Sequence, residues 1–109
     1  MDVSKELIKG TVVPIVLSLL NEQPRYGYEI VKVVNARTNG RFEWKEGTLY
    51  PTLHRLEEQR MIKAQWRDSD SGKQRKYYAL TRRGRSELVQ RQEEWKSFSQ
   101  AVSLFLTGA

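Results

Sequence analysis

Apolar positions change their spacing several times along the chain, and each change predicts an element. A short helix is expected over residues 3–10, and a second, largely apolar helical segment over residues 12–21. Thr11 stands where the N-cap of that second segment would be. Pro14 then falls in a first helical turn, where a missing N–H costs little. If one helix instead runs through from Ser4, Pro14 should kink it.

The next segment, residues 26–38, carries a second helical pattern. Residues 23–25 before it are typical of a turn, and Asn39-Gly40 after it is a suitable C-cap. The spacing of its apolar residues predicts one buried face, made by Ile30, Val33 and Val34.

A third helix is expected over residues 46–59, after a short connection at 41–45. Leu49, Leu53 and Leu56 follow i, i+4, i+7 and form a buried stripe. The opposite face then carries Pro51, His54, Arg55 and Glu58, with Thr48 and Tyr50 at its flanks. If Thr48 caps this helix, Pro51 lies in its first turn and is tolerated.

Strand periodicity replaces helical periodicity after residue 61. Ile62, Ala64 and Trp66 alternate with polar residues, a polar loop covers 68–74, and residues 75–80 return as a second strand. Thr81 is suited to be the N-cap of a long helix that reaches about residue 106. The order predicts a mainly α fold with a small β-hairpin, a winged helix-turn-helix domain over residues 1–80. Residues 81–109 add a C-terminal dimerisation helix to the same compact unit.

The charge is concentrated in the middle of the chain. The 109 residues carry a net charge of +6, and residues 41–84 alone hold 11 basic and 6 acidic side chains. A local basic excess is typical of a protein that binds a polyanion, although it also occurs on ordinary solvated surfaces.

Several function classes are disfavoured by what the chain lacks. It has no Cys and a single His, His54, so we expect no metal site and no cofactor. The N-terminus lacks the pattern of a signal peptide and no apolar stretch is long enough to span a bilayer, so we expect a cytoplasmic protein with no membrane partner. No nucleophile-and-base set surrounds His54, and the pairs Glu57-Glu58 and Glu93-Glu94 each point in two directions, so we expect no enzyme.

Two groups of residues together suggest binding to double-stranded DNA. The outer face of the third helix could enter a major groove, and the hairpin could follow the phosphate backbone. Either group alone would be explained as an ordinary polar surface. The outer helix face followed along the chain by a basic hairpin favours DNA binding. The predicted contacts are Thr48, Tyr50, Pro51, His54 and Arg55 on the helix, and Lys73, Arg75 and Lys76 on the hairpin.

The last helix has its own apolar stripe. Trp95, Phe98, Val102 and Phe105 follow i, i+3, i+7, i+10, and Leu88 and Leu106 extend the same broad face. The stripe could pack on residues 12–20 of the same chain, but a domain this small has little surface to cover it. We therefore favour a homodimer interface. Trp95 is either a core residue of that interface or a surface on which a small planar aromatic effector stacks.

Three ordered motifs resemble the PadR family of transcriptional regulators. They are PRYGYEI at 24–30, GTLYPTLHRLE at 47–57, and RKYYALT at 75–81 followed by Gly84, and the similarity covers about residues 5–106. The chain departs from the family pattern at Lys45, where members often have a Ser N-cap.

The resemblance implies a homodimeric bacterial or archaeal transcription factor, usually a repressor, that binds imperfect inverted repeats. Its last helix would pack with the first and last helices of the partner. Short members with a single C-terminal helix include drug-responsive repressors with a Trp-lined pore at the dimer centre, and Trp95 lies in a similar part of the helix. Tyr26 and Tyr28 in the first motif would help to hold the DNA backbone. The alternative is a winged-helix interaction module that binds an acidic protein partner rather than DNA.

Overall fold

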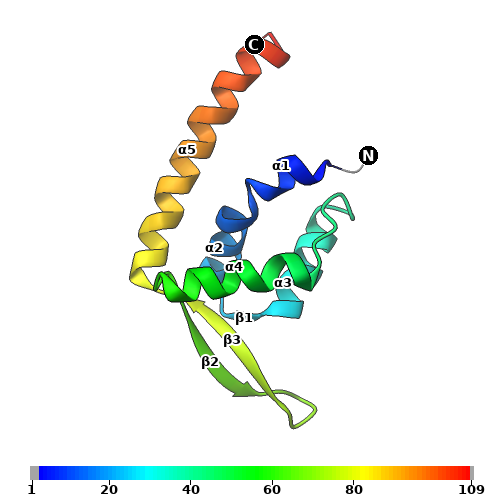
Figure 1. Cartoon of the computed structure of the whole chain (residues 1–109), viewed down its shortest axis with the longest axis vertical. Coiled ribbons are helices and arrows are strands. Elements are labelled where there is room, and N and C mark those ends of the chain that lie inside the picture. Colours follow the sequence, from blue (N-terminus) through cyan, green and yellow to red (C-terminus); the bar gives the residue numbers. More distant parts are fainter. Residues whose placement is uncertain (1–2, 109) are drawn as a thin grey trace.

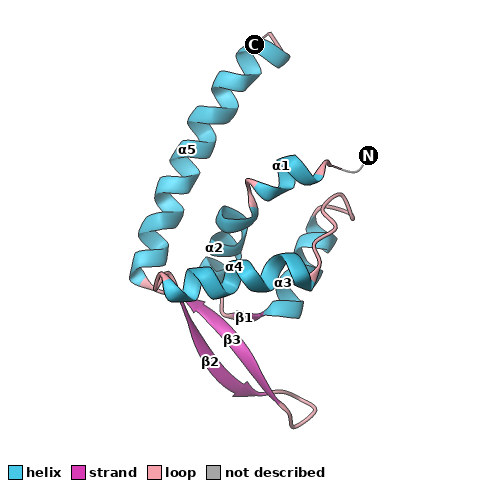
Figure 2. Cartoon of the chain, in the orientation of Figure 1, coloured by secondary structure: helices cyan, strands magenta, loops and turns pink. Residues whose placement is uncertain are grey.

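The computed structural model describes residues 3–108 as a helical protein with one small antiparallel sheet (Figures 1 and 2). In chain order its elements are α1 (Lys5–Lys9), α2 (Val12–Glu22), β1 (Arg25–Tyr26), α3 (Gly27–Arg37), α4 (Glu46–Glu58), β2 (Ile62–Asp68), β3 (Gln74–Leu80) and α5 (Arg82–Leu106). The expected winged helix-turn-helix fold is confirmed, with α3 and α4 as the helix-turn-helix and the β2–β3 hairpin as the wing.

The wing is a long two-stranded hairpin that projects from the helical body (Figure 2). Its register runs from Ile62 opposite Leu80 to Asp68 opposite Gln74. At its tip Gly72 has φ +84°, a left-handed conformation that other residues adopt only with strain. The loop and both strands therefore follow the sequence prediction closely.

The sheet has a third strand, β1, that the sequence analysis did not predict. It pairs with β3 in the order β1-β3-β2, with Arg25 opposite Tyr78 and Tyr26 opposite Tyr77. We expected a turn at Arg25 and helix from Tyr26, whereas the helix begins one residue later, at Gly27. A two-residue strand is too short to show a period, and only its pairing with a distant strand creates it.

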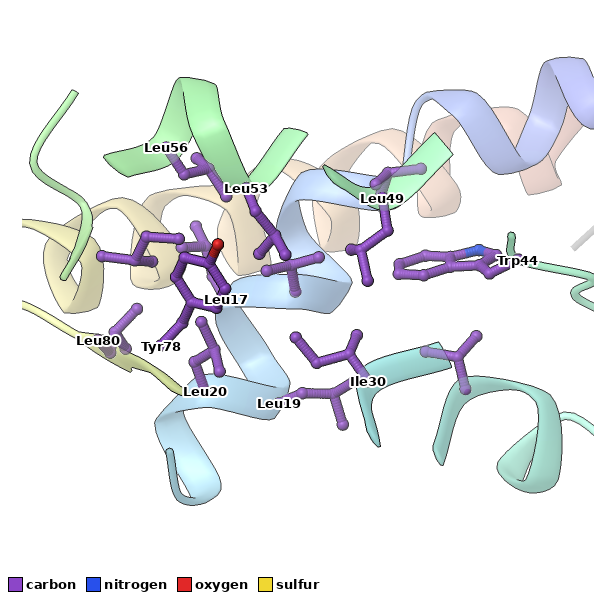
Figure 3. Packing of buried hydrophobic residues seen from close by; sticks show 14 of the residues in the cluster. Leu17, Leu19, Leu20, Ile30, Trp44, Leu49, Leu53, Leu56, Tyr78 and Leu80 are labelled. Carbon is purple, nitrogen blue, oxygen red and sulfur yellow. The ribbon is translucent and has the colours of Figure 1, made fainter. Parts of the chain in front are cut away.

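The core lies where α2, α3, α4 and the base of the sheet meet. Figure 3 shows Leu49, Leu53 and Leu56 of α4 pointing into a cluster that contains Leu17 of α2 and Ile30 of α3. All five are at most 2% exposed, which confirms the predicted leucine stripe. Burial of one such side chain contributes about 1.5–3 kcal/mol, so the stripe fixes which way α4 faces.

Several helix ends differ from the prediction in detail. Pro14 is the third residue of α2, so it lies in a first turn and does not kink a longer helix. Thr11 occupies the N-cap position, but its hydroxyl donates to the Ile8 carbonyl and caps nothing. Helix α4 begins at Glu46 after Lys45, so Thr48 is not its cap and Pro51 lies inside the helix rather than in its first turn.

The connection before α4 contributes to the core, which the sequence analysis did not foresee. Trp44 is 4% exposed and packs with the core, and its backbone N–H donates to Asn35 Oδ1. On α3, Val31 is buried and Val33 is only half-buried, so the buried face is rotated slightly from the predicted one.

Arg25 is a buried cation that joins the end of α2 to β1. Its Nε donates to the Leu19 carbonyl at 3.2 Å, and its Nη2 donates to Glu22 Oε1 at 2.6 Å. Glu22 also accepts from Arg37, and this hydrogen bond, with help from Arg25, lowers the pKa of Glu22 to about 2. The network fixes the short strand β1 and therefore the position of Tyr26.

Helix α5 starts against the base of the wing and then leaves the body (Figure 1). The Thr81 hydroxyl accepts from the Gly84 N–H, as the sequence predicts, and donates to the Arg60 carbonyl. A Cβ on Gly84 would overlap the Met61 carbonyl, so only glycine allows this close approach. Among residues 3–108, no helix is long and apolar enough to cross a membrane.

Candidate nucleic-acid interface

The outward face of α4 is the first part of the candidate interface. Thr48, Pro51, His54 and Arg55 are exposed, and Tyr50 is half-buried. Because the leucine stripe holds the opposite face against the core, these side chains point away from the protein body. The predicted division of this helix into a buried and an outward face is correct.

A surface groove joins α4 to the start of α3 and to the wing. Its volume is about 390 Å³, and we call it the tyrosine groove. It contains six of the ten side chains predicted to bind DNA. Its lining residues are Tyr26, Gly27, Tyr28, Tyr50, His54, Arg75, Lys76 and Tyr78.

Cations and aromatic rings are packed together at the wing side of the groove. The Arg75 guanidinium lies 4.5 Å from the centroid of the Tyr26 ring, and Tyr26 makes an edge contact with Tyr77 at 5.4 Å. An aromatic ring attracts a cation but has no net charge, so it does not neutralise the cation as a carboxylate would. Arg75 therefore keeps its charge while its stem is positioned by the sheet.

Lys76 is engaged differently. Its Nζ donates to Glu57 Oε1 of α4 at 3.4 Å, and it lies 5.3 Å from the ring of Tyr78. Burial lowers the pKa of Lys76, but Tyr78 and Glu57 outweigh this and the pKa is raised overall. Lys76 thus links the wing to the recognition helix, whereas Arg75 makes no ion pair with a carboxylate among residues 3–108.

Tyr50 and Gly27 fit against each other where α4 approaches α3. A Cβ on Gly27 would lie 2.8 Å from the Tyr50 hydroxyl oxygen and 2.9 Å from Cε1. Burial raises the pKa of the Tyr50 phenol, and Glu46 adds to this, so the hydroxyl stays protonated and can donate a hydrogen bond. Tyr50 is predicted from the sequence as a DNA contact, whereas its fit against Gly27 depends on how α4 packs beside α3.

The remaining predicted DNA contacts lie outside the tyrosine groove. Thr48, Pro51 and Arg55 line a wider hollow of about 810 Å³ between α4 and the N-terminal segment. Arg55 Nη2 donates to the Thr52 hydroxyl at 3.4 Å, which positions it along the helix. Lys73 is exposed near the tip of the wing. The ten side chains therefore form a groove and two flanks rather than one pocket.

Trp66 and Arg67 on β2 are further candidates that sequence reasoning missed. Trp66 follows the strand alternation of Ile62 and Ala64, but it is 64% exposed because the wing extends beyond the core at that point. Arg67 lies 5.0 Å from the ring of Tyr77, opposite Arg75 in the register. Only the register shows that these cations share one face of the wing.

The apolar stripe of α5 is largely uncovered in the single chain. Trp95, Phe98, Phe105 and Leu106 are between 56% and 86% exposed, and Val102 is half-buried. Leu88 is a correction to the predicted interface, because it is 4% exposed and belongs to the core of its own protomer. Its turn of α5 packs against the body, whereas the later turns do not.

No group of three or more His, Asp or Glu side chains in the described residues is arranged to hold a metal ion. The polar chemistry of the candidate interface therefore comes from cations, phenols and one imidazole.

Comparison with known proteins identifies the family. Residues 16–90 match the model of the PadR-like family of transcriptional regulators. The chain belongs to this family. The predicted resemblance is thus confirmed, the PadR-like chain is a transcriptional regulator, and its family implies DNA binding. Transcriptional regulators are not enzymes, as the sequence analysis expected.

Individual relatives agree with this assignment. An uncharacterised protein of Lysinibacillus sphaericus is 39% identical over 97% of both chains. The transcriptional regulator YqjI of Escherichia coli is 30% identical over 87% of this chain, which spans 44% of that longer protein. A transcriptional regulator from Clostridium thermocellum has a solved structure with 36% identity and a TM-score of 0.87, covering 95% of this chain and 98% of the other.

The contact between Gly27 and Tyr50 generates a prediction. Gly27→Ala should displace the Tyr50 ring, because the new Cβ would clash with the hydroxyl end of that side chain, which is free to move. We expect a loss of DNA affinity of about tenfold, the size of one good polar contact, with the thermal midpoint nearly unchanged. A DNA titration and a thermal melt measure the two quantities.

Gly10→Ala is the control, because nothing lies within 4 Å of a Cβ at that position and its φ of −73° suits alanine. It should melt at the same temperature or higher and bind DNA as the native chain does. Equal affinity of the Gly27→Ala and native chains would contradict the assigned role of Tyr50.

Proposed function

We propose that the protein is a sequence-specific DNA-binding repressor that acts as a homodimer on an inverted-repeat operator. The observation that carries this proposal is the tyrosine groove, where α4, the start of α3 and the wing bring cations and phenols together. A footprint on the DNA upstream of its own gene tests it. Protection of two related half-sites is the expected result.

The two sides of the candidate interface, α4 and the wing, suit different parts of a DNA duplex. Tyr50, His54 and Arg55 lie on a helix face that fits a major groove, where Arg can bond guanine bidentately. The wing cations are placed for the phosphates, which supply affinity without sequence information. Tyr26 and Tyr28, at the groove rim, would hold the backbone between them.

The family resemblance supports repression as the proposed mode of regulation, and so does the place where such a dimer would bind. A protein seated on a promoter excludes other proteins from the same DNA. A footprint that overlaps the promoter, together with raised transcription when the gene is deleted, would support it.

Arg75→Ala should weaken binding to all DNA sequences by a similar factor. Because Arg75 is free of carboxylates and faces the groove, its loss removes about one phosphate contact. In a homodimer one contact is lost from each protomer, so the slope of log affinity against log salt should fall by about 1.8, or about 0.9 for each contact. Lys96→Gln, on the exposed face of α5 opposite the apolar stripe, is a control that should leave the slope unchanged. An unaltered slope for Arg75→Ala would count against the phosphate role.

The homodimer is supported by the uncovered stripe of α5. The helix is 25 residues long, about 37 Å, and only Gly84 and Leu88 are buried along it. Dimers of this kind can place two recognition helices about 34 Å apart, on successive major grooves.

Phe98→Glu should convert the dimer into a monomer and abolish high-affinity operator binding. A carboxylate at the centre of the stripe cannot be buried without a partner cation. Light scattering after size-exclusion chromatography gives the mass directly. Gln100→Glu, which places the same charge on the opposite face of α5, should remain dimeric. A Phe98→Glu chain that still dimerises would exclude this interface.

A small planar aromatic effector is proposed to bind at Trp95. The ring is 56% exposed and lies 6.2 Å from the ring of Phe98, so two such pairs in a dimer could enclose a flat molecule. Acridine added without DNA should quench tryptophan emission in the native chain and not in Trp95→Phe. Equal quenching of both would remove Trp95 from the effector site.

The alternative is an interaction module for an acidic protein, since the same cations would attract one. A titration with the upstream DNA and a random duplex separates the two. No preference for the upstream DNA would favour the interaction module.

A further inference from the structure

The start of α5 carries a set of cations that the proposed function does not use. Thr81 donates to the Arg60 carbonyl, and Gly84 packs against the Met61 carbonyl, so the first turn of α5 lies directly on the segment that enters β2. The arrangement gathers five cations at the base of the wing, which we call the basal cation cluster. Its members are Arg60, Lys63, Arg82, Arg83 and Arg85.

Every member of the basal cation cluster is exposed, and none forms an ion pair with a carboxylate in residues 3–108. The nearest acidic residues along the chain are Glu58, at the exposed end of α4, and Glu87, which accepts a hydrogen bond from Arg91. The cluster therefore keeps its full positive charge.

Three of these cations stand where helix electrostatics disfavours them. Arg82, Arg83 and Arg85 are the first, second and fourth residues of a 25-residue helix whose first turn has no acidic residue. The N-terminus of a helix carries partial positive charge, so cations there reduce stability and anions increase it. Residues that reduce the stability of the fold, such as these arginines, are often found at sites that bind another molecule.

The cluster is continuous with the cations of the wing. Along β2, Lys63 and Arg67 point to the same face, and Arg75 of β3 shares it because it pairs with Arg67. Lys63 and Arg67 are separated by four residues of strand, about 13 Å. A row of positive charge therefore runs from the wing toward the start of α5. Its length is comparable to the length of DNA backbone that spans several phosphates of one strand.

We propose that the basal cation cluster binds the phosphate backbone of duplex DNA that flanks the operator. DNA leaving α4 and the tip of the wing continues along the outer face of the wing to the start of α5. The inference rests on the proposed function and extends the contact surface beyond the operator bases that α4 would contact. The contact is independent of sequence, because guanidinium groups that meet phosphates read no bases.

The test compares two duplexes built on the footprinted operator. The short duplex ends at the outer edges of the two half-sites, and the long duplex adds about one helical turn of unrelated sequence at each side. The variant is the triple substitution Arg82→Gln, Arg83→Gln and Arg85→Gln. The control removes a cation elsewhere, with Lys96→Gln on the exposed face of α5 opposite the apolar stripe.

The native chain should bind the long duplex about tenfold more tightly than the short one. The triple arginine variant should lose this advantage and keep its affinity for the short duplex. In the homodimer the triple substitution removes up to six phosphate contacts, so its salt slope on the long duplex should fall by about 5, or about 0.9 for each lost contact. Its thermal midpoint should equal or exceed that of the native chain, because cations have been removed from a helix N-terminus. The lysine control should retain the length advantage.

A length advantage that survives in the triple arginine variant would overturn the inference, and so would a native chain with equal affinity for both duplexes. Failure of the native chain to bind either duplex would overturn the proposed function itself. The two failures are therefore distinguishable.

Discussion

The burial of one leucine stripe governs the rest of the structure. Leu49, Leu53 and Leu56 pack against α2 and α3 and are almost fully excluded from water. Since a helix has two sides, this burial determines that Tyr50, His54 and Arg55 face outward or to the edge. The same packing fixes α4 relative to α3, and so brings Tyr50 to Gly27.

The tyrosine groove is composite, and no single segment could form it. Residues 26–28, 50–54 and 75–78 are separated along the chain by twenty or more residues each. They are held together by three specific links: Arg25 anchors β1 to the end of α2, Gly27 admits Tyr50, and Lys76 bonds Glu57. An interface built this way depends on the fold as a whole, so a change far from the DNA can alter binding.

Helix α5 shows local sequence choices that oppose the stability of a lone chain. Its first turn places arginines against the helix dipole, and its later turns expose Trp95, Phe98 and Phe105 to water. Both features are explained if other molecules bind there. DNA phosphates would neutralise the arginines at the start of the helix, and a second chain would cover the apolar stripe. Sites where local and global preferences conflict are often functional ones.

The sequence by itself determined the elements with strong periodicity: the helices, the wing, the buried face of α4 and the stripe of α5. Those follow from regular spacing, which is a local property of the chain. Only the tertiary structure decided β1, the burial of Trp44, the exposure of Trp66 and the removal of Leu88 from the stripe. Each of these depends on what lies opposite a residue in space. Spacing along the chain holds no information about that neighbour, so packing alone could settle which cations converge and which face they share.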